Sequence, residues 1–324
     1  MTASTENRSA LLESLAERVA RYYVDEATGR EMAERLRSRA GELEQAGWGK
    51  PLADALTAVM HEVYADKHLR VLYPGPEGRG RESDQTPEEA ARAVRLAGGH
   101  IRKVERLAGN VGYLDLGLFA PPEQAGELMV AAINLLVDSS ALLIDLTRCR
   151  GGHPGMVALL SSYLLDGPTH LNSLWWRQGE QTIQFWSLPY VPGKRFGGRK
   201  PLFILTSGRT ASAAEEFTNN LKQLKRAVVV GERTAGAGNP GGFHPLPGGY
   251  EVFIPNGKAI NPITGTGWEG VGIEPDIAVP AGEGLQTAYR EALRRVIAGL
   301  EGVESGPERA LRREAEEALG ALGT

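Results

Sequence analysis

The sequence predicts an α/β protein in which a small helical subdomain precedes a largely parallel sheet with helical cover. Two observations support this prediction. Apolar residues recur at helical spacing through residues 8–64, whereas from residue 110 onward short apolar runs alternate with helical patterns. Because alternating strands and helices are joined by right-handed crossovers, the second region is expected to form a mainly parallel sheet.

We expect four consecutive parts along the chain. They are an N-terminal helical subdomain ending in a strand (1–75), a linker with a helix near 88–107 (76–109), an α/β core (110–300) and a charged helical tail (301–324). Within the core, strands are expected at 111–116, 141–146, 202–206 and 227–230, with helices near 123–137, 154–165 and 211–225. A hairpin is expected from 169–177 and 181–187, around Gln178-Gly179-Glu180.

The composition restricts the class of protein and its partners. Hydrophobic residues make up 42% of the 324 residues and charged residues 23%, the balance of a globular protein. The net charge of -4 argues against a nucleic-acid partner, because phosphate binding needs a concentrated basic face. The single cysteine, Cys149, excludes an intrachain disulfide and a cysteine zinc cluster. No two histidines have the spacing of metal ligands, so we expect neither a metal nor a cofactor.

The same survey gives an expected location. No apolar run approaches the length of a membrane span, about 18 residues. The N-terminal stretch turns directly into a charged helical pattern and lacks the apolar core of a signal peptide. A cytoplasmic protein is therefore expected, although an exported protein trimmed of its signal has the same appearance.

Ser212 follows a buried strand and a short turn, and a helix begins beside it. A serine there lies near unpaired backbone N–H groups and the positive end of the helix dipole, which stabilise an alkoxide and an oxyanion. The pattern therefore fits a nucleophile. It also fits a simple N-cap, because Glu215 three residues later completes a capping box.

A pair of glycines, Gly151-Gly152, follows the predicted strand 141–146. Glycines let the backbone approach a ligand without an intervening Cβ, so their N–H groups and that of Ala213 are candidates for an oxyanion hole. An ordinary strand-to-helix turn would look the same. Further along, the Gly- and Pro-dense stretch 260–276 points to a defined, close-packed loop.

In this order, the three stretches resemble the tail-specific (C-terminal-processing) protease superfamily, which includes the tricorn protease core and the interphotoreceptor retinoid-binding protein modules. Two further superfamily motifs appear here as Val229–Thr234, a Val-Val-Gly-Glu-x-Thr strand, and Gly270–Asp276, close to a Gly-Val-x-Pro-Asp ending. The resemblance covers residues 110–280 and implies a ClpP/crotonase-like core with Ser212 as nucleophile. The helical N-terminus resembles the opening of a retinoid-binding module.

The sequence departs from the superfamily at its catalytic base. Common bacterial members use a lysine in Gly-Lys-Gly about two dozen residues after the serine, whereas this chain has Ala237 between two glycines. The tricorn branch uses a histidine and a glutamate instead, and His68 and Glu269 match those positions. The resemblance therefore implies a Ser212–His68–Glu269 set, in which a neutral imidazole accepts the serine proton.

Other residues allow more than one role. His153 follows the glycine pair and could contact substrate or start a helix, and His244 could approach the site or serve in packing. Between Tyr73 and Val111 the chain is too short for the PDZ domain that tail-specific proteases usually carry, so none is expected. The predicted function is that of a serine peptidase acting on a peptide or protein. The alternative is a non-catalytic carrier of an apolar small molecule, a retinoid or fatty acid.

Overall fold

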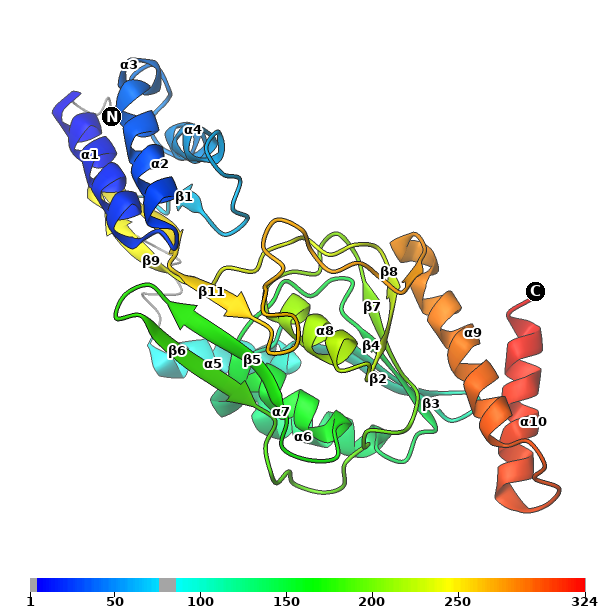
Figure 1. The fold of residues 1–324 in the computed structure, drawn as a ribbon. Helices are drawn as coiled ribbons and strands as arrows, with labels where there is room; N and C mark the ends of the chain where they lie inside the picture. The colour runs from blue at the N-terminus through cyan, green and yellow to red at the C-terminus, as the bar shows by residue number, and fades with distance from the viewer. Residues whose placement is uncertain (1–4, 76–85, 324) are drawn as a thin grey trace. The chain divides into compact units, whose positions relative to one another are not determined.

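The computed structural model describes residues 5–75 and 86–323, and the chain divides into two units (Figure 1). What we call the N-terminal unit comprises Met1–Ala90, Ser173–Ile183 and Ala237–Ile260. What we call the sheet unit comprises Ala91–Asn172, Gln184–Gly236 and Asn261–Thr324.

The sheet unit is built on a six-stranded sheet with the strand order β12-β8-β7-β4-β3-β2. All neighbouring strands are parallel except β2, which pairs antiparallel with β3 at one edge. The strands are β2 (Ile101–Leu107), β3 (Val111–Leu116), β4 (Ala141–Asp145), β7 (Leu202–Thr206), β8 (Val228–Gly231) and β12 (Ile277–Ala278).

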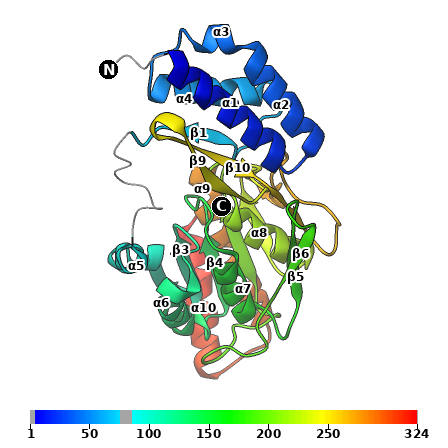
Figure 2. The same ribbon diagram turned by 90° about the vertical axis from the view of Figure 1, so that its left-hand side faces the viewer.

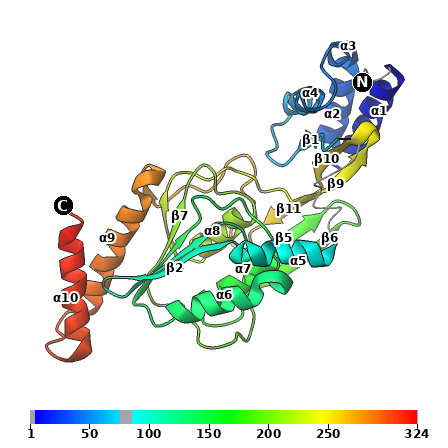
Figure 3. The ribbon, with the colours of Figure 1, turned by 180° about the vertical axis from the view of Figure 1, so that it is seen from behind.

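Helices cover both faces of this sheet, as Figure 3 shows with α6 and α7 on one side and α9 and α10 on the other. The helices are α6 (Pro122–Leu136), α7 (Pro154–Leu164), α8 (Ala213–Gln223), α9 (Ala281–Gly299) and α10 (Gly306–Ala321). Successive residues of one strand point to opposite faces of the sheet and so belong to different cores. In β4, Leu142 packs with α6, α7 and α8, whereas Leu143 packs with α9 and α10. Burial on both faces explains why these strands read as continuous apolar runs.

The N-terminal unit packs four helices against a three-stranded antiparallel sheet of order β1-β10-β9 (Figure 2). The elements are α1 (Thr5–Tyr22), α2 (Glu26–Ser38), α3 (Ala40–Leu43), α4 (Lys50–His61), β1 (Arg70–Leu72), β9 (Gly241–Leu246) and β10 (Tyr250–Pro255). Its core joins helix residues such as Leu15 and Met32 to Val71, Tyr250 and Val252 of the sheet. The helices expected in the first part of the sequence therefore complete their core with strands from much later in the chain.

A second small sheet has the order β11-β5-β6. Its strands are β5 (His170–Trp176), β6 (Gln181–Trp186) and β11 (Gly257–Ile260). The turn between β5 and β6 lies at residues 177–180, which confirms the predicted hairpin. Strand β6 forms the outer edge of the three and most of its side chains are exposed.

The predicted fold class is confirmed, and the element predicted near 88–107 differs. The sequence predicts a helix near 88–107, whereas α5 (Pro87–Leu96) ends early and β2 follows after a short 3-10 turn, η2 (Gly98–His100). Gly98 and Gly99 adopt φ of 62° and 64°, a left-handed backbone that ends an α-helix. The apolar residues of 101–107 suit helical spacing, but pairing with β3 determines the observed conformation.

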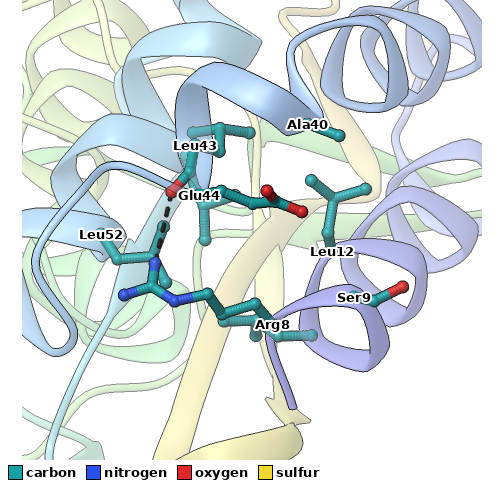
Figure 4. Close-up of a pocket in the computed structure, with 9 residues that line it drawn as sticks. Arg8, Ser9, Leu12, Ala40, Leu43, Glu44 and Leu52 are labelled. Carbon is teal, nitrogen blue, oxygen red and sulfur yellow. Dashed lines mark hydrogen bonds between the residues drawn. The ribbon is translucent and has the colours of Figure 1, made fainter. Parts of the chain in front are cut away.

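Two further features of the described residues bear on function. No helix among them is both long and apolar enough to cross a membrane. A pocket opens among the helices of the N-terminal unit, where Arg8 donates to the Leu43 carbonyl and leucine side chains form most of the wall (Figure 4).

Candidate active site

Ser212 lies at the turn between β7 and α8, one residue before the helix begins. Its backbone is strained, with φ 56° and ψ -124°, in a region that costs a non-glycine residue about 1–3 kcal/mol. Nearby contacts fix the turn, since the Thr210 hydroxyl donates to the Leu146 carbonyl at 2.8 Å and the Ala211 N–H to that of Cys149 at 3.2 Å. A strained residue held in this way is typical of a functional position.

The glycine pair lies directly against this serine. Gly151 has φ 116°, and a Cβ placed on it would lie 2.6 Å from the Ser212 Cβ. Gly152 has φ 131°, and a Cβ there would lie 2.2 Å from the Phe119 carbonyl oxygen. Both positions therefore need glycine for conformation and for space.

Backbone N–H groups remain available around Ser212. Phe119 donates to the Gly151 carbonyl at 2.8 Å, and its own carbonyl accepts from the N–H of His153 at 2.7 Å. The N–H groups of Gly151, Gly152 and Ala213 have no acceptor among the residues that the structure describes. Such N–H groups are the usual donors to an oxyanion in acyl-transfer sites.

Glu215 joins the nucleophile segment to the loops that follow it. Its buried carboxylate accepts the N–H of Ser212 at 2.9 Å, the hydroxyl of Thr234 at 2.5 Å and the N–H of Gly236 at 2.7 Å. The network continues, because Thr234 Oγ1 accepts the N–H of Ile273 at 2.7 Å and Gly236 O accepts that of Gly270 at 2.9 Å. The loop that carries Glu269 is thereby connected to Ser212 within the sheet unit.

The sequence gives Glu215 only a capping role, so its three-way contact was missed. The structure shows one hydrogen bond of the capping box, from the Ser212 N–H to the Glu215 carboxylate. The signal that could have revealed more is the apolar residues around it, Ala213, Ala214 and Phe217, because a carboxylate buried among them needs several donors.

Glu216, the next residue, has a different environment. It is also buried, but one carboxyl oxygen has no hydrogen-bond partner among the described residues. Burial raises the pKa of Glu216 to about 8, although the neighbouring Asn172 side chain favours the charged form. Glu216 is therefore largely protonated at neutral pH.

Ala237, which the resemblance places where the superfamily has its lysine, is buried. Lys222 lies in the last turn of α8, where its ammonium donates to Asp276 at 2.6 Å and to the Glu274 carbonyl at 2.7 Å. Lys222 therefore serves the far end of the helix from Ser212.

His68 lies in the N-terminal unit, just before β1. Its ring is 5.7 Å from that of Phe253, and its backbone N–H donates to the Asp66 carboxylate at 2.9 Å. Burial lowers the pKa of His68, whereas the charge of Asp66 raises it and that of Arg70 lowers it further. The net effect keeps the imidazole neutral, which suits a proton acceptor.

Asp66 is itself fully buried and well partnered. It accepts the hydroxyl of Tyr23 at 3.2 Å and the side-chain amide of Asn239 at 3.0 Å, in addition to the N–H of His68. Asp66 thus fixes the backbone of His68 and supplies a negative charge beside it.

The other two candidate histidines make local contacts. His153 is the N-cap of α7, and its Nδ1 accepts the N–H of Gly155 at 3.1 Å. His244 stacks on Tyr22 of α1, with ring centroids 4.6 Å apart. Both contacts fit the structural roles that the sequence allowed for these residues.

The structure brings Ser212, Ala213 and the glycine pair together in the sheet unit, with Glu269 in a connected loop of the same unit. A serine on a strand-to-helix turn, beside backbone N–H groups without acceptors among the described residues, has the arrangement that serine-nucleophile hydrolases use. The chain belongs to peptidase family S41, whose model matches residues 110–279.

Individual relatives agree with this family. The chain is 29% identical over 180 residues to the chloroplastic carboxyl-terminal-processing peptidase 1 of Arabidopsis thaliana, a match that covers 54% of this chain and 35% of that protein. It is 32% identical over 80 residues to a carboxy-terminal-processing protease of Bartonella bacilliformis, covering 25% of this chain and 18% of the relative. The chain thus spans about a third of the first relative's length, or less in the second case.

Solved structures share the fold. A putative peptidase from Parabacteroides merdae has a TM-score of 0.59 at 18% identity, covering 100% of this chain and 98% of that one. The photosystem II D1 C-terminal processing protease has a TM-score of 0.56 at 16% identity, covering 86% and 94%. The tricorn protease has a TM-score of 0.52 at 13% identity, covering 97% of this chain and 37% of its own. At these identities the likeness concerns the fold.

Proposed function

We propose that this protein is a serine peptidase that cleaves peptide or protein substrates with Ser212 as nucleophile and a histidine in place of the superfamily lysine. The strained backbone of Ser212, pressed against Gly151 and beside unpaired N–H groups, is the observation that supports this proposal most directly. A serine that serves only as an N-cap ordinarily has an extended backbone, so capping alone does not account for the strain at Ser212.

In the proposed reaction, Ser212 Oγ attacks the substrate carbonyl carbon while His68 accepts the hydroxyl proton. The N–H groups of Gly152 and Ala213 stabilise the negative charge that forms on the carbonyl oxygen, with Gly151 fixing their approach. His68 then returns the proton to the departing amine, and water hydrolyses the acyl-enzyme by the same steps. Glu269 orients the imidazole. The scheme requires the two units to bring His68 to Ser212.

A carrier of an apolar ligand is not proposed, since no specific feature of the site favours it. The relatives described above are processing peptidases by name. A carrier would also have no need of a strained serine with free N–H groups beside it.

Two matched pairs of proteins test the proposal. A fluorophosphonate probe should label the wild type at Ser212 alone, and Ser212→Ala should abolish both labelling and hydrolysis of an activated ester. His68→Ala should reduce turnover at least about a hundredfold, the usual size of a general-base contribution. His244→Ala, which removes a ring stacked on Tyr22, should cost little. Labelling that survives Ser212→Ala, or the reverse ranking of the two histidines, would overturn the assignment.

A further inference from the structure

Three side chains form a line across the small sheet of the N-terminal unit. Arg70 of β1 lies opposite Phe253 of β10, which lies opposite Phe243 of β9. Directly opposed residues of antiparallel strands share a face, so the three project from the same side. The two rings meet edge to face at 5.0 Å, and the guanidinium lies 5.9 Å from the Phe253 ring. We call these three residues the aromatic row.

The aromatic row lies on the side of the sheet that does not pack on the helices. The next register of the same strands, Val71 and Val252, is buried in the helical core. Because side chains alternate along a strand, the row must face the other way. His68 lies on this side as well, with its ring 5.7 Å from Phe253.

Two side chains of the aromatic row have surface that is available to a ligand. Phe243 is 45% exposed although its ring is large and apolar. Arg70 is exposed and makes no ion pair among the residues that the structure describes. Aromatic rings beside an arginine are the side chains that most often dominate recognition surfaces, because they combine apolar area with a directional charge.

The spacing of the row suits an extended peptide. Adjacent strands lie about 4.8 Å apart, so the row is about 10 Å long. A side chain resting between the two rings would lie about 7 Å from Arg70, which equals the separation of residues i and i+2 in an extended chain. One peptide could therefore place an apolar side chain on the rings and an acidic one on the guanidinium.

We propose that the aromatic row binds an extended peptide substrate carrying a large apolar residue and, two positions away, an acidic residue. The apolar side chain contacts Phe243 and Phe253, and the carboxylate pairs with Arg70. The substrate role rests on the proposed function, since His68 beside the row is what would bring this peptide to the reaction. Peptide binding itself requires no hydrolysis.

The test uses the full chain with Ser212→Ala and three fluorescein-labelled peptides of one length, measured by fluorescence anisotropy. The first carries Phe-x-Asp, the second Ala-x-Asp and the third Phe-x-Lys. We expect the first to bind at least about tenfold more tightly than either of the others, the effect of burying one aromatic ring or pairing one charge. Phe243→Ala should remove the preference for Phe over Ala. Arg70→Glu should reverse the preference for Asp over Lys.

Controls separate this proposal from misfolding and from failure of the peptidase assignment. Phe243→Leu keeps an apolar side chain and should retain most of the preference, whereas Tyr190→Ala removes an exposed ring of the sheet unit and should change nothing. Equal affinities for the three peptides, or preferences that survive both Phe243→Ala and Arg70→Glu, would overturn the proposal. A wild type that discriminates among the peptides but never cleaves an ester overturns the peptidase proposal alone.

Discussion

Around Ser212 the working groups are backbone atoms, whereas around His68 they are side chains drawn from distant parts of the chain. Gly151, Gly152 and Ala213 contribute N–H groups and the absence of a Cβ, and they lie within one short turn of their own strand or helix. Asp66 depends instead on Tyr23 and Asn239, which are far apart in sequence. Local sequence therefore specifies the surroundings of the proposed nucleophile, while only the tertiary fold specifies those of the proposed base.

The largest effect is expected from adding one methyl group beside the nucleophile. Gly151→Ala would place a Cβ 2.6 Å from the Ser212 Cβ in a left-handed backbone, so the serine or the glycine loop must move. We expect turnover of an activated ester to fall by about a thousandfold, the upper range for losing an oxyanion-hole donor.

A matched glycine shows whether this loss is specific. Gly126 lies within α6, where an added Cβ would meet nothing closer than 3.7 Å. Gly126→Ala should keep full activity and raise the free energy of unfolding by about 0.5–1 kcal/mol, because alanine has the better helix propensity. If Gly151→Ala retains activity, the backbone account of Ser212 is wrong.

The second effect concerns the network that connects this turn to the following loops. Glu215→Gln keeps the shape of the side chain but replaces one carboxylate oxygen with an NH2 group. That group cannot accept a hydrogen bond from the N–H and O–H groups that Glu215 binds. Misplacement of Ser212 should lower kcat about a hundredfold, with KM little changed. Steady-state kinetics on one peptide would show the split. A rise in KM at constant kcat would mean that Glu215 serves binding and does not position the nucleophile.

The strand, turn and helix around Ser212 could be predicted well from sequence for a physical reason. A buried strand, a turn and a helix start are local patterns, and they fix where Ser212 and the glycine pair lie. The segment Ala237–Ile260 illustrates the opposite case. It lies in sequence between the parallel strands β8 and β12, yet its strands β9 and β10 complete the core of the N-terminal helices. No periodicity reports which partner a strand will choose.

The same reasoning explains what was missed at the site. Glu215 looks like half of a capping box because that motif depends on spacing alone, whereas its bonds to Thr234 and Gly236 depend on tertiary packing. Asp66 lies two residues before His68, but nothing in the sequence indicates that Asn239 will donate to it. His68 itself was predicted as the base only from the resemblance to the tricorn branch.

A third, smaller effect tests the side-chain environment of the histidine. The charge of Asp66 raises the pKa of His68, so Asp66→Asn should lower that pKa. Because His68 must be neutral to accept a proton, activity is retained down to the pH at which it becomes protonated, and a lower pKa extends activity to lower pH. We expect the acid limb of kcat/KM to lie below pH 6.5 in the wild type and to move to lower pH in the variant.

Tyr23→Phe is the control for this experiment. It removes one hydrogen bond to Asp66 and leaves the carboxylate charge in place, so the acid limb should hardly move. Identical limbs in all three proteins would show that Asp66 acts only on the backbone of His68, or that His68 is not the titrating base.

The smallest effect on turnover is expected at Glu216, which lies beside Glu215 but shares none of its donors. Its pKa is about 8 in the folded protein against about 4.5 when unfolded, so between these values the folded state holds a proton that the unfolded state has lost. The contribution of this group to the free energy of unfolding is fully present below pH 4.5. It falls as pH rises, by about 1.4 kcal/mol per pH unit, until it is lost above pH 8.

Glu216→Gln keeps a neutral side chain at every pH and should remove this loss without changing turnover at pH 6. In urea unfolding at pH 5, 6, 7 and 8, the free energy of unfolding of the variant should therefore increase relative to that of the wild type at each step. The contributions of all other groups cancel in this difference. Parallel curves would mean that Glu216 is charged in the fold, and the contrast between the two neighbouring carboxyls would then be lost.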